Sequence, residues 1–525
     1  MALQAVTFPL ILTALVPQEQ RPPSIKPVRL ADTAIITIDG NLDEEAWAAA
    51  AKLSPLTQVQ PVEGARPSRR TEVRLCYDRD SLYLAFTCFD DPDEVRGRIM
   101  ARDARLDADD RVEFWIDTFH DRRFAFWFQI GAGGSKGDAL IADNGSRFNK
   151  SWDGIWYGKS AIDGRGWRAE IAIPFKTLSF HEGLSTWGFN LVRHRKANDE
   201  ELRWAAPYVA HRFFRLSVGG TLEGLSGMRQ GIGLELIPYV KASASRDRSL
   251  RKHTSRLGET GTDLYYRVST AMRFALTLNT DFAETEVDQR RVNLTRFPLF
   301  FPEKRDFFLE DAGLFEFGPS SPRGRSPDLI PFFSRRIGRT EAGDTLPILA
   351  GSKLTGRVGG WNIGALGTYT GRKNAIDERG LGVLRVSRNV GRESALGVIL
   401  TAGHPEQPVH AVTGGVDFAI GDTIAFGPSS GYKVWGFWLG SQRSGAGGDG
   451  EAYALEADFN STNWSHRSGL RVIGSEFDPA LGFLRRSGVR IYRHMSRYVW
   501  RDDGFIRGLT FQVTPSLTTL TDGST

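Results

Sequence analysis

The sequence has few cysteines, no long apolar run and no block of like charge, and each absence excludes a class of protein. Its 525 residues include only two cysteines, Cys76 and Cys88, too few for a disulfide framework or a cysteine-based zinc site. No stretch approaches the roughly 18 to 20 continuous apolar residues of a membrane-spanning helix. The 67 basic and 62 acidic residues are interspersed rather than gathered in runs, which disfavours nucleic-acid binding.

Common catalytic motifs are missing as well. The chain has no HExxH or GxxxxGK[ST] motif, and no GxSxG or GxGxxG in a strand-to-helix setting. Glu113 and Asp117 would face the same side of one strand about 13 Å apart, which is too far for the carboxylate pair of a glycosidase. These absences disfavour an enzyme of the classes that carry such motifs.

Glycine and aromatic residues are abundant. The 57 Gly, 33 Phe and 13 Trp residues are typical of aromatic-rich β structure with many tight turns, so the sequence predicts an all-β protein. At the amino terminus, the apolar run 8–16 precedes a polar, Pro-rich segment, as in a secretory signal, although no Lys or Arg comes before it. Residues 1–27 are thus expected to be an export signal or a disordered leader.

Residues 28–220 are expected to form a β-sandwich. Apolar side chains alternate along 73–77, 82–88, 112–116, 124–130 and 167–173, and acidic turn clusters separate these segments. Cys76 and Cys88 fall on neighbouring expected strands, where a cross-strand disulfide or two buried thiols are the alternatives.

Four separated segments in this region, 38–47, 74–90, 109–117 and 166–178, carry a resemblance. In their order they resemble a family 9 carbohydrate-binding module over about residues 35–215. The resemblance implies a β-sandwich in which two tryptophans hold the end of a sugar chain.

The segment 143–158 has the side chains that sugar recognition requires. Pyranose rings present apolar C–H faces to aromatic rings, while their hydroxyls need carboxylate, amide or guanidinium partners. Trp152 and Trp156 are the stacking candidates, and Asn149, Asp153 and Arg147 are the polar candidates. The alternative is that these tryptophans fill the core. A second stacking wall from Trp115 or Trp127, or none, stays open.

The same resemblance implies calcium, which takes about six to eight oxygen ligands. Asp138, Asp143 and Asp153 are close enough in sequence to contribute. The competing interpretation is that they are solvated turn aspartates.

Residues 221–525 predict an antiparallel β-barrel of the outer-membrane type. Segments of about ten residues alternate apolar with small or polar side chains, the pattern of strands that face lipid on one side. A large soluble β structure is the alternative. The sequence leaves open whether the barrel is complete.

A segment at about 285–345 lacks a strand period and mixes aromatic with charged residues, as expected for a linker, lumen plug or docking ledge. With residues 477–488, it resembles a bacterial family of unknown function that follows family 9-like modules in outer-membrane proteins. We therefore expect a glycan-binding protein associated with the bacterial outer membrane, active in saccharide capture or carbohydrate catabolism. Two alternatives stay open: an O-glycosyl hydrolase, because family 9 modules usually accompany glycosidases, and a structural outer-membrane barrel whose sandwich has lost its ligand. Its sandwich would be periplasmic or surface-exposed, and nucleic acid is not an expected partner.

Overall fold

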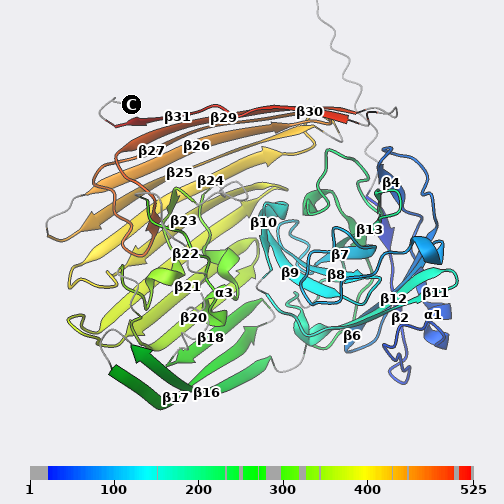
Figure 1. Cartoon of the computed structure of the whole chain (residues 1–525), viewed down its shortest axis with the longest axis horizontal. Coiled ribbons are helices and arrows are strands. Elements are labelled where there is room, and N and C mark those ends of the chain that lie inside the picture. Colours follow the sequence, from blue (N-terminus) through cyan, green and yellow to red (C-terminus); the bar gives the residue numbers. More distant parts are fainter. Residues whose placement is uncertain are drawn as a thin grey trace, which may run out of the picture.

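The computed structural model describes residues 22–521, except 151, 182, 231–232, 248–251, 270, 280–296, 319–326, 342–344, 428–429, 446–448, 502–505 and 507. Most of the expected leader and part of the expected linker segment therefore lie outside the described residues. The described chain is almost entirely β structure, as predicted, and its strands form a two-sheet unit followed by one long curved sheet (Figure 1).

Two sheets form the amino-terminal unit. The first runs in the order β1 (Ser24–Ile25), β15 (Gly220–Leu222), β13 (Trp187–Arg195), β7 (Arg111–Asp117), β8 (Ala125–Gly131), β9 (Lys136–Ala142) and β10 (Arg147–Asn149), with β14 (Glu200–Arg203) and β4 (Thr57–Gln60) attached at β13. The second runs in the order β11 (Tyr157–Asp163), β12 (Gly166–Pro174), β6 (Ser81–Phe89), β5 (Thr71–Tyr77) and β2 (Val28–Arg29), with β3 (Ala51–Lys52) beside β5.

The core between these two sheets confirms the predicted sandwich. Apolar side chains from alternate positions of both sheets pack together, for example Leu75 and Phe86 from one sheet with Phe114 and Phe128 from the other. The rings of Phe86 and Phe114 meet across the gap with centroids 6.2 Å apart. The short helix α1 (Glu45–Ala49) buries Trp47 against the outer face of the second sheet.

The strand register decides between the two alternatives for the cysteines. Cys88 pairs with Thr71, and Cys76 pairs with Tyr83. Cys88 therefore points into the sandwich core while Cys76 packs under α1 on the opposite face. Both are buried free thiols, and burial raises the pKa of each to about 12.

The carboxyl-terminal region is one antiparallel sheet. Its strands follow chain order: β16 (Leu234–Asp247), β17 (Lys252–Ser269), β18 (Met272–Leu278), β20 (Ile348–Val358), β21 (Trp361–Thr370), β22 (Arg379–Val390), β23 (Ser394–Ala402), β24 (Ala411–Asp422), β25 (Gly431–Arg443), β26 (Gly450–Asn460), β27 (Trp464–Ile473), β29 (Val489–Arg501) and β30 (Gly508–Val513), while β31 (Ser516–Leu520) also pairs with β29. Within the described residues no pair joins β16 to the far edge. The sheet is thus open, where an antiparallel barrel, complete or incomplete, was expected.

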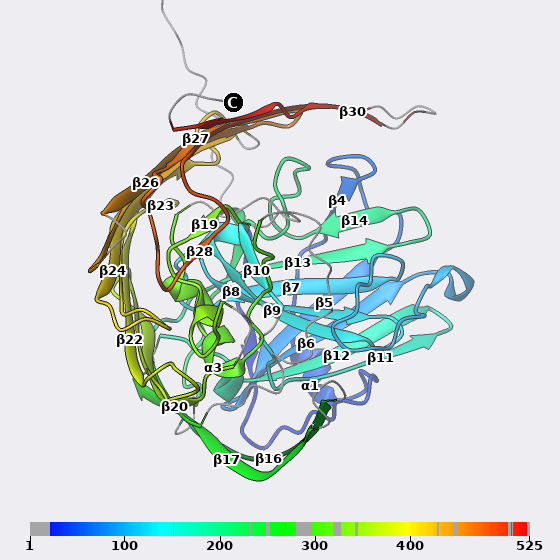
Figure 2. The same cartoon turned by 60° about the vertical axis from the view of Figure 1, so that its left-hand side comes forward.

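The two faces of this sheet differ. Figure 2 shows that it curves around the side of the sandwich. Its concave face carries the segment 297–318, with α3 (Asp306–Leu309) and η5 (Ala312–Phe315), which buries Phe307, Phe308 and Phe315 against strands β17 to β22. The small pair β19 (Leu329–Ile330) and β28 (Phe483–Leu484) lies apart from the main sheet. The convex face of the long curved sheet exposes apolar side chains.

No helix in the described part of the chain has the length and apolar character needed to cross a bilayer.

Candidate functional site

Arg102 forms hydrogen bonds with two aspartates in and beside the segment for which the sequence predicts a sugar site. Arg102 precedes β7, and its Nη2 donates to Oδ2 of Asp138 at 2.6 Å and to Oδ1 of Asp153. Its Nε lies 3.5 Å from Oδ2 of Asp103. Asp138 is buried, whereas the side chain of Asp153 is 76% exposed. Arg102 therefore links a buried aspartate to an aspartate at the surface.

Trp156 is buried beside this cluster and contacts it from the sandwich interior. Its ring is only 3% exposed and packs edge-on against Phe128, with centroids 5.4 Å apart. Its indole N–H donates to Oδ2 of Asp138 at 2.8 Å, and the backbone N–H of Gly154 donates to Oδ1 at 3.2 Å. Burial raises the pKa of Asp138 above its ordinary value, although these two hydrogen bonds act to lower it. Because the Trp156 ring lies in the sandwich interior, it presents no open stacking face.

Trp152 differs from Trp156, because its ring is half-buried. It rests on Phe126 and Phe128, with centroid distances of 5.1 and 6.1 Å. The next residue along the chain is the exposed Asp153. An aromatic ring and a carboxylate–guanidinium pair therefore occur together at the surface, and we call Trp152, Asp153 and Arg102 the Trp152 platform.

The other two polar candidates lie on β10. Arg147 does not join the platform: it forms an ion pair with Glu316, and its Nη2 donates to the carbonyl oxygen of Gly318 at 2.9 Å. Asn149 ends the strand, opposite Leu140 of β9. The structure thus brings Trp152, Asp153 and Trp156 together and directs Arg147 toward the carboxyl-terminal region.

Two of the three aspartates considered for calcium have described side chains, and both pair with the same arginine. Asp138 and Asp153 both contact Arg102. The side chain of Asp143 lies outside the described residues. Over the ranges that the structure describes, no group of three or more His, Cys, Asp or Glu side chains is arranged to hold a metal ion.

The two tryptophans considered as a second stacking surface for the sugar lie on the outer face of the first sheet, away from the sandwich core. Trp115 and Trp127 pack on the outer face, under Phe213 and Phe148. Trp127 donates to Oε2 of Glu113 at 3.1 Å. Since Trp152 packs with the inner-face rings, Trp115 and Trp127 do not stand opposite it.

Glu113 anchors an outer-face cluster that sequence reasoning missed. Its Oε1 lies 2.7 Å from Nε of Arg111 and 3.3 Å from Nε2 of His194. Burial alone would raise the pKa of Glu113, but His194 and Arg111 outweigh it and hold this pKa at about 2.

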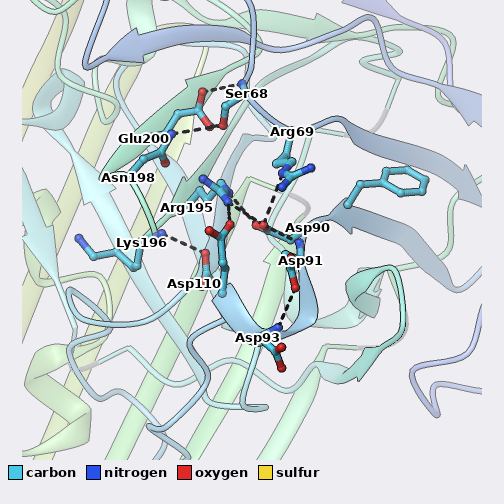
Figure 3. A network of polar contacts seen from close by, with 12 residues as sticks. Ser68, Arg69, Asp90, Asp91, Asp93, Asp110, Arg195, Lys196, Asn198 and Glu200 are labelled. Atoms are coloured by element: carbon cyan, nitrogen blue, oxygen red, sulfur yellow. Dashed lines mark hydrogen bonds and ion pairs between the residues drawn. The ribbon is translucent and has the colours of Figure 1, made fainter.

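A second polar network joins the strand ends of the two sheets (Figure 3). Asp90, at the end of β6, is buried and accepts two hydrogen bonds of 2.8 Å from Arg195 and one of 3.0 Å from Arg193. Arg69 adds an ion pair at 3.9 Å. Nearby, Glu200 accepts from the backbone N–H and the hydroxyl of Ser68. These contacts fasten one sheet of the sandwich to the other.

The carboxylates of Asp109 and Asp110 accept hydrogen bonds from backbone N–H groups. Oδ2 of Asp109 accepts the N–H groups of Arg98 and Ile99 at 2.7 Å each. Asp110 accepts the N–H groups of Arg96 at 2.6 Å and Lys196 at 3.1 Å. Both carboxylates therefore hold the chain segment 96–99 and the turn after β13 in place.

Beside β10, a cleft of about 450 Å³ separates the sandwich from the concave face of the curved sheet. Sandwich residues Arg123 and Arg147 line one wall. Arg385, Trp435 and Arg467, from β22, β25 and β27, belong to the opposite wall. The cleft contains neither Trp152 nor Asp153, so it is distinct from the Trp152 platform.

No local sequence signal marks the residues that were missed. Arg102 contacts partners 36 and 51 residues further along the chain. The cleft joins strands that are hundreds of residues apart, as in the hydrogen bond from Arg123 to the carbonyl oxygen of Ser394. Both arrangements depend on tertiary packing.

Comparisons with known proteins cover the two regions separately. Residues 231–356 match a family described as domain of unknown function (DUF5916). A family 9 carbohydrate-binding module from Caldicellulosiruptor kristjanssonii, solved with glucose, is similar at 17% identity over 40% of this chain and 99% of that one, with a TM-score of 0.29. Its complex with cellotriose gives 17% identity, 39% and 95% coverage and a TM-score of 0.29.

A third solved structure, a putative carbohydrate-binding protein from Bacteroides uniformis, is similar at 16% identity over 38% of this chain and 99% of that one, with a TM-score of 0.33. No curated protein sequence matches the chain. The fold itself is that of an all-β protein in which a sandwich precedes a long curved sheet, and the family match falls on the first strands of that sheet.

Proposed function

We propose that the sandwich binds a saccharide at the Trp152 platform. The observation that carries the proposal is the half-buried Trp152 ring beside the exposed Asp153–Arg102 pair. The ring offers an apolar face for sugar C–H groups, and the ion pair offers an acceptor and a donor for hydroxyls. The order of the four motifs that resemble a family 9 module supports the same assignment.

The platform residues have separate roles in this proposal. Trp152 stacks on the sugar, while Asp153 and Arg102 bind its hydroxyl groups. Asp138 and Trp156 hold Arg102 in place from below through the contacts described above. Asn149 is close to the platform in sequence and is proposed as a further polar contact.

The test is calorimetric titration of the full chain with glucose and cellotriose, followed by a glycan array. Trp152→Ala should weaken binding by about 1 to 3 kcal/mol, the range for truncating an aromatic anchor. Tyr157→Ala, which removes an exposed ring from neighbouring β11, is the matched control and should leave affinity unchanged. Equal affinities for wild type and Trp152→Ala would remove Trp152 from the site.

Calcium and hydrolysis are tested in the same experiment. Calcium binding through Asp138, Asp143 and Asp153 remains a proposal, and titrations with calcium or with EDTA decide it. The hydrolase alternative requires that bound glycan be cleaved, which chromatography of the recovered ligand would detect.

We further propose that the curved sheet places the protein in the bacterial outer membrane. The supporting observation is the convex face, where adjacent strands present exposed apolar side chains in register, such as Val398 opposite Val416 and Val416 opposite Trp438. A contiguous apolar surface of this kind is typical of a membrane or protein interface. Because lipid cannot satisfy edge hydrogen bonds, the two outer strands must be paired or covered there.

The loops suggest an orientation. The turns 359–360, 391–393 and 461–463 lie at one end of the sheet, which we call the short-turn end, together with one longer connection, 423–430. The longer connections 371–378, 403–410 and 474–488 lie at the other, the long-loop end. Outer-membrane strands are joined by short turns on the periplasmic side. We therefore propose that the sandwich, which contacts the short-turn end through Ser394, is periplasmic.

A further inference from the structure

The cleft between sandwich and curved sheet is strongly cationic. Eight Arg and Lys side chains line it against four Asp and Glu side chains, an excess of four positive charges. Three of the four carboxylates form ion pairs: Asp417 with Arg385, Asp458 with Arg467 and Glu316 with Arg147. The lining also contains Arg123, Arg212, Arg357, Lys433 and Arg497. Facing walls of one charge sign concentrate anions between them.

A buried donor in the cleft lacks a partner. Trp435 of β25 is 8% exposed, and its indole N–H has no hydrogen-bond partner within the described part of the chain. Two cations flank the ring: Nζ of Lys433 at 5.8 Å and Cζ of Arg467 at 5.6 Å from its centroid. The nitrogen itself is enclosed by protein, so the two cations beside the ring are what this part of the wall contributes to the cleft.

Neutral hydrogen-bonding groups complete the lining. The amide nitrogen of Asn362 lies 3.2 Å from the hydroxyl of Ser387 and 3.1 Å from the amide oxygen of Asn389, so these three residues form a small polar ladder across β21 and β22. Amides and hydroxyls of this kind match sugar hydroxyl groups. The volume of about 450 Å³ is within the range of pockets that hold small organic ligands.

From the charge, the volume and the polar ladder, we propose that this cleft is a second ligand site that binds an anionic oligosaccharide. The carboxylate or sulfate groups of the sugar contact the arginines and Lys433, and its hydroxyls contact the amide and hydroxyl side chains. The site lies between the sandwich and the concave face of the sheet. It does not depend on saccharide binding at Trp152.

The test compares two ligands with the same sugar chain, one with three carboxylates and one in which each carboxylate is an uncharged methyl ester. Trigalacturonate and its fully methyl-esterified form are titrated into the full chain in detergent solution. Trigalacturonate should bind, and it should bind more weakly at 0.5 M than at 0.05 M NaCl because its contacts are ionic. The uncharged ester should bind at least about tenfold more weakly, the factor that one lost charge-assisted contact produces. Equal affinity for the two ligands would overturn the proposal.

Charge-removing variants locate the binding. Lys433→Gln combined with Arg497→Gln should weaken trigalacturonate binding about tenfold or more, and Arg497→Gln alone should give a smaller loss in the same direction. Arg388→Gln is the control, since Arg388 is exposed and lies over Trp361 outside the cleft. Unchanged affinity in the folded Arg497→Gln and double variants would exclude the cleft.

Two competition and mutation measurements distinguish the oligosaccharide site from a site for small anions and from the Trp152 platform. Inorganic phosphate at 10 mM should not displace trigalacturonate, and displacement would assign the cleft to a free anion and overturn the saccharide ligand. Trp152→Ala should leave trigalacturonate binding unchanged. Failure of the platform and failure of the cleft are therefore distinguishable in the same titrations.

Discussion

At the scale of single residues, Gly154 places the ring that we assign to sugar stacking. A Cβ at position 154 would lie 2.6 Å from Cη2 of Trp152, closer than nonbonded carbon atoms approach. The Trp152 ring folds back over its own chain only because residue 154 has no side chain. The backbone of Gly154 also donates to Asp138, so one glycine serves both the ring and the buried carboxylate.

We expect Gly154→Ala to displace the Trp152 ring, because the added methyl group overpacks this contact. Saccharide binding should weaken by about 1 to 3 kcal/mol, the range for losing an aromatic anchor. Calorimetric titration with the glycan found for the wild type measures the loss. Gly164→Ala is the matched control, because a Cβ at Gly164 meets no atom within 4 Å. If Gly154→Ala binds the glycan as tightly as the wild type does, saccharide binding does not depend on the present position of the Trp152 ring.

Glu113 makes a pH-dependent contribution to the sandwich. Its pKa of about 2 in the fold lies below the ordinary value of 4.5. A depressed carboxyl pKa stabilises the fold above the ordinary value, and the contribution disappears as the pH falls toward 2. Glu113→Gln should therefore be less stable than wild type at neutral pH, by an amount on the order of 2 kcal/mol, and the difference should shrink between pH 5 and 2.

Denaturant unfolding of both proteins at several pH values measures this difference. Glu45→Gln, which removes an exposed charge of α1, controls for the change in net charge. A gap between wild type and Glu113→Gln that stays constant from pH 6 to pH 2.5 would contradict the assignment.

At the scale of strands, the sequence was enough to predict features that depend on residues close together in the chain, such as the strands themselves. The alternation along 73–77 and 112–116 identified β5 and β7 because each strand buries every second side chain in one core. The register of Cys76 and Cys88 was not predictable to the residue, since a shift of one position reverses the face. Arg102 and the cleft depend on contacts between distant segments, which alternation does not encode.

Strand β23 gives the clearest test of the convex face. Leu396, Val398 and Leu400 are 46 to 59% exposed, and the residues between them are buried. An arginine on a lipid-facing strand costs about 2 to 4 kcal/mol near the middle of the bilayer. We therefore expect Val398→Arg to lower the stability of the protein folded into lipid vesicles by about that amount, as measured by urea titration.

The control for Val398→Arg is Ser387→Arg on the neighbouring strand β22. Ser387 pairs with Gly397 and lines the cleft on the concave face. The new charge therefore faces protein and water, and the lipid-folded state should lose little stability. Equal losses for both variants would mean that the convex face does not meet lipid.

At the scale of the whole molecule, three contacts fasten the sandwich to the short-turn end of the curved sheet. Arg123 donates to the carbonyl oxygen of Ser394, Ser217 donates to Oε1 of Glu393 at 2.6 Å, and Cζ of Arg357 lies 4.0 Å from the centroid of the Phe124 ring. Since all three join strand ends to the same side of the sandwich, the sandwich and the short turns should lie on the same side of a membrane.

Cysteine labelling in intact cells tests this orientation, because both native thiols are buried and their pKa values are raised to about 12, which keeps them unreactive. Arg372→Cys introduces a thiol at the long-loop end, where residue 372 is exposed. Arg165→Cys introduces one in an exposed turn of the sandwich. A membrane-impermeant maleimide should label position 372 in intact cells and position 165 only after the outer membrane is permeabilised. Labelling of position 165 in intact cells would place the sandwich outside, on the cell surface, and would overturn the proposed periplasmic orientation.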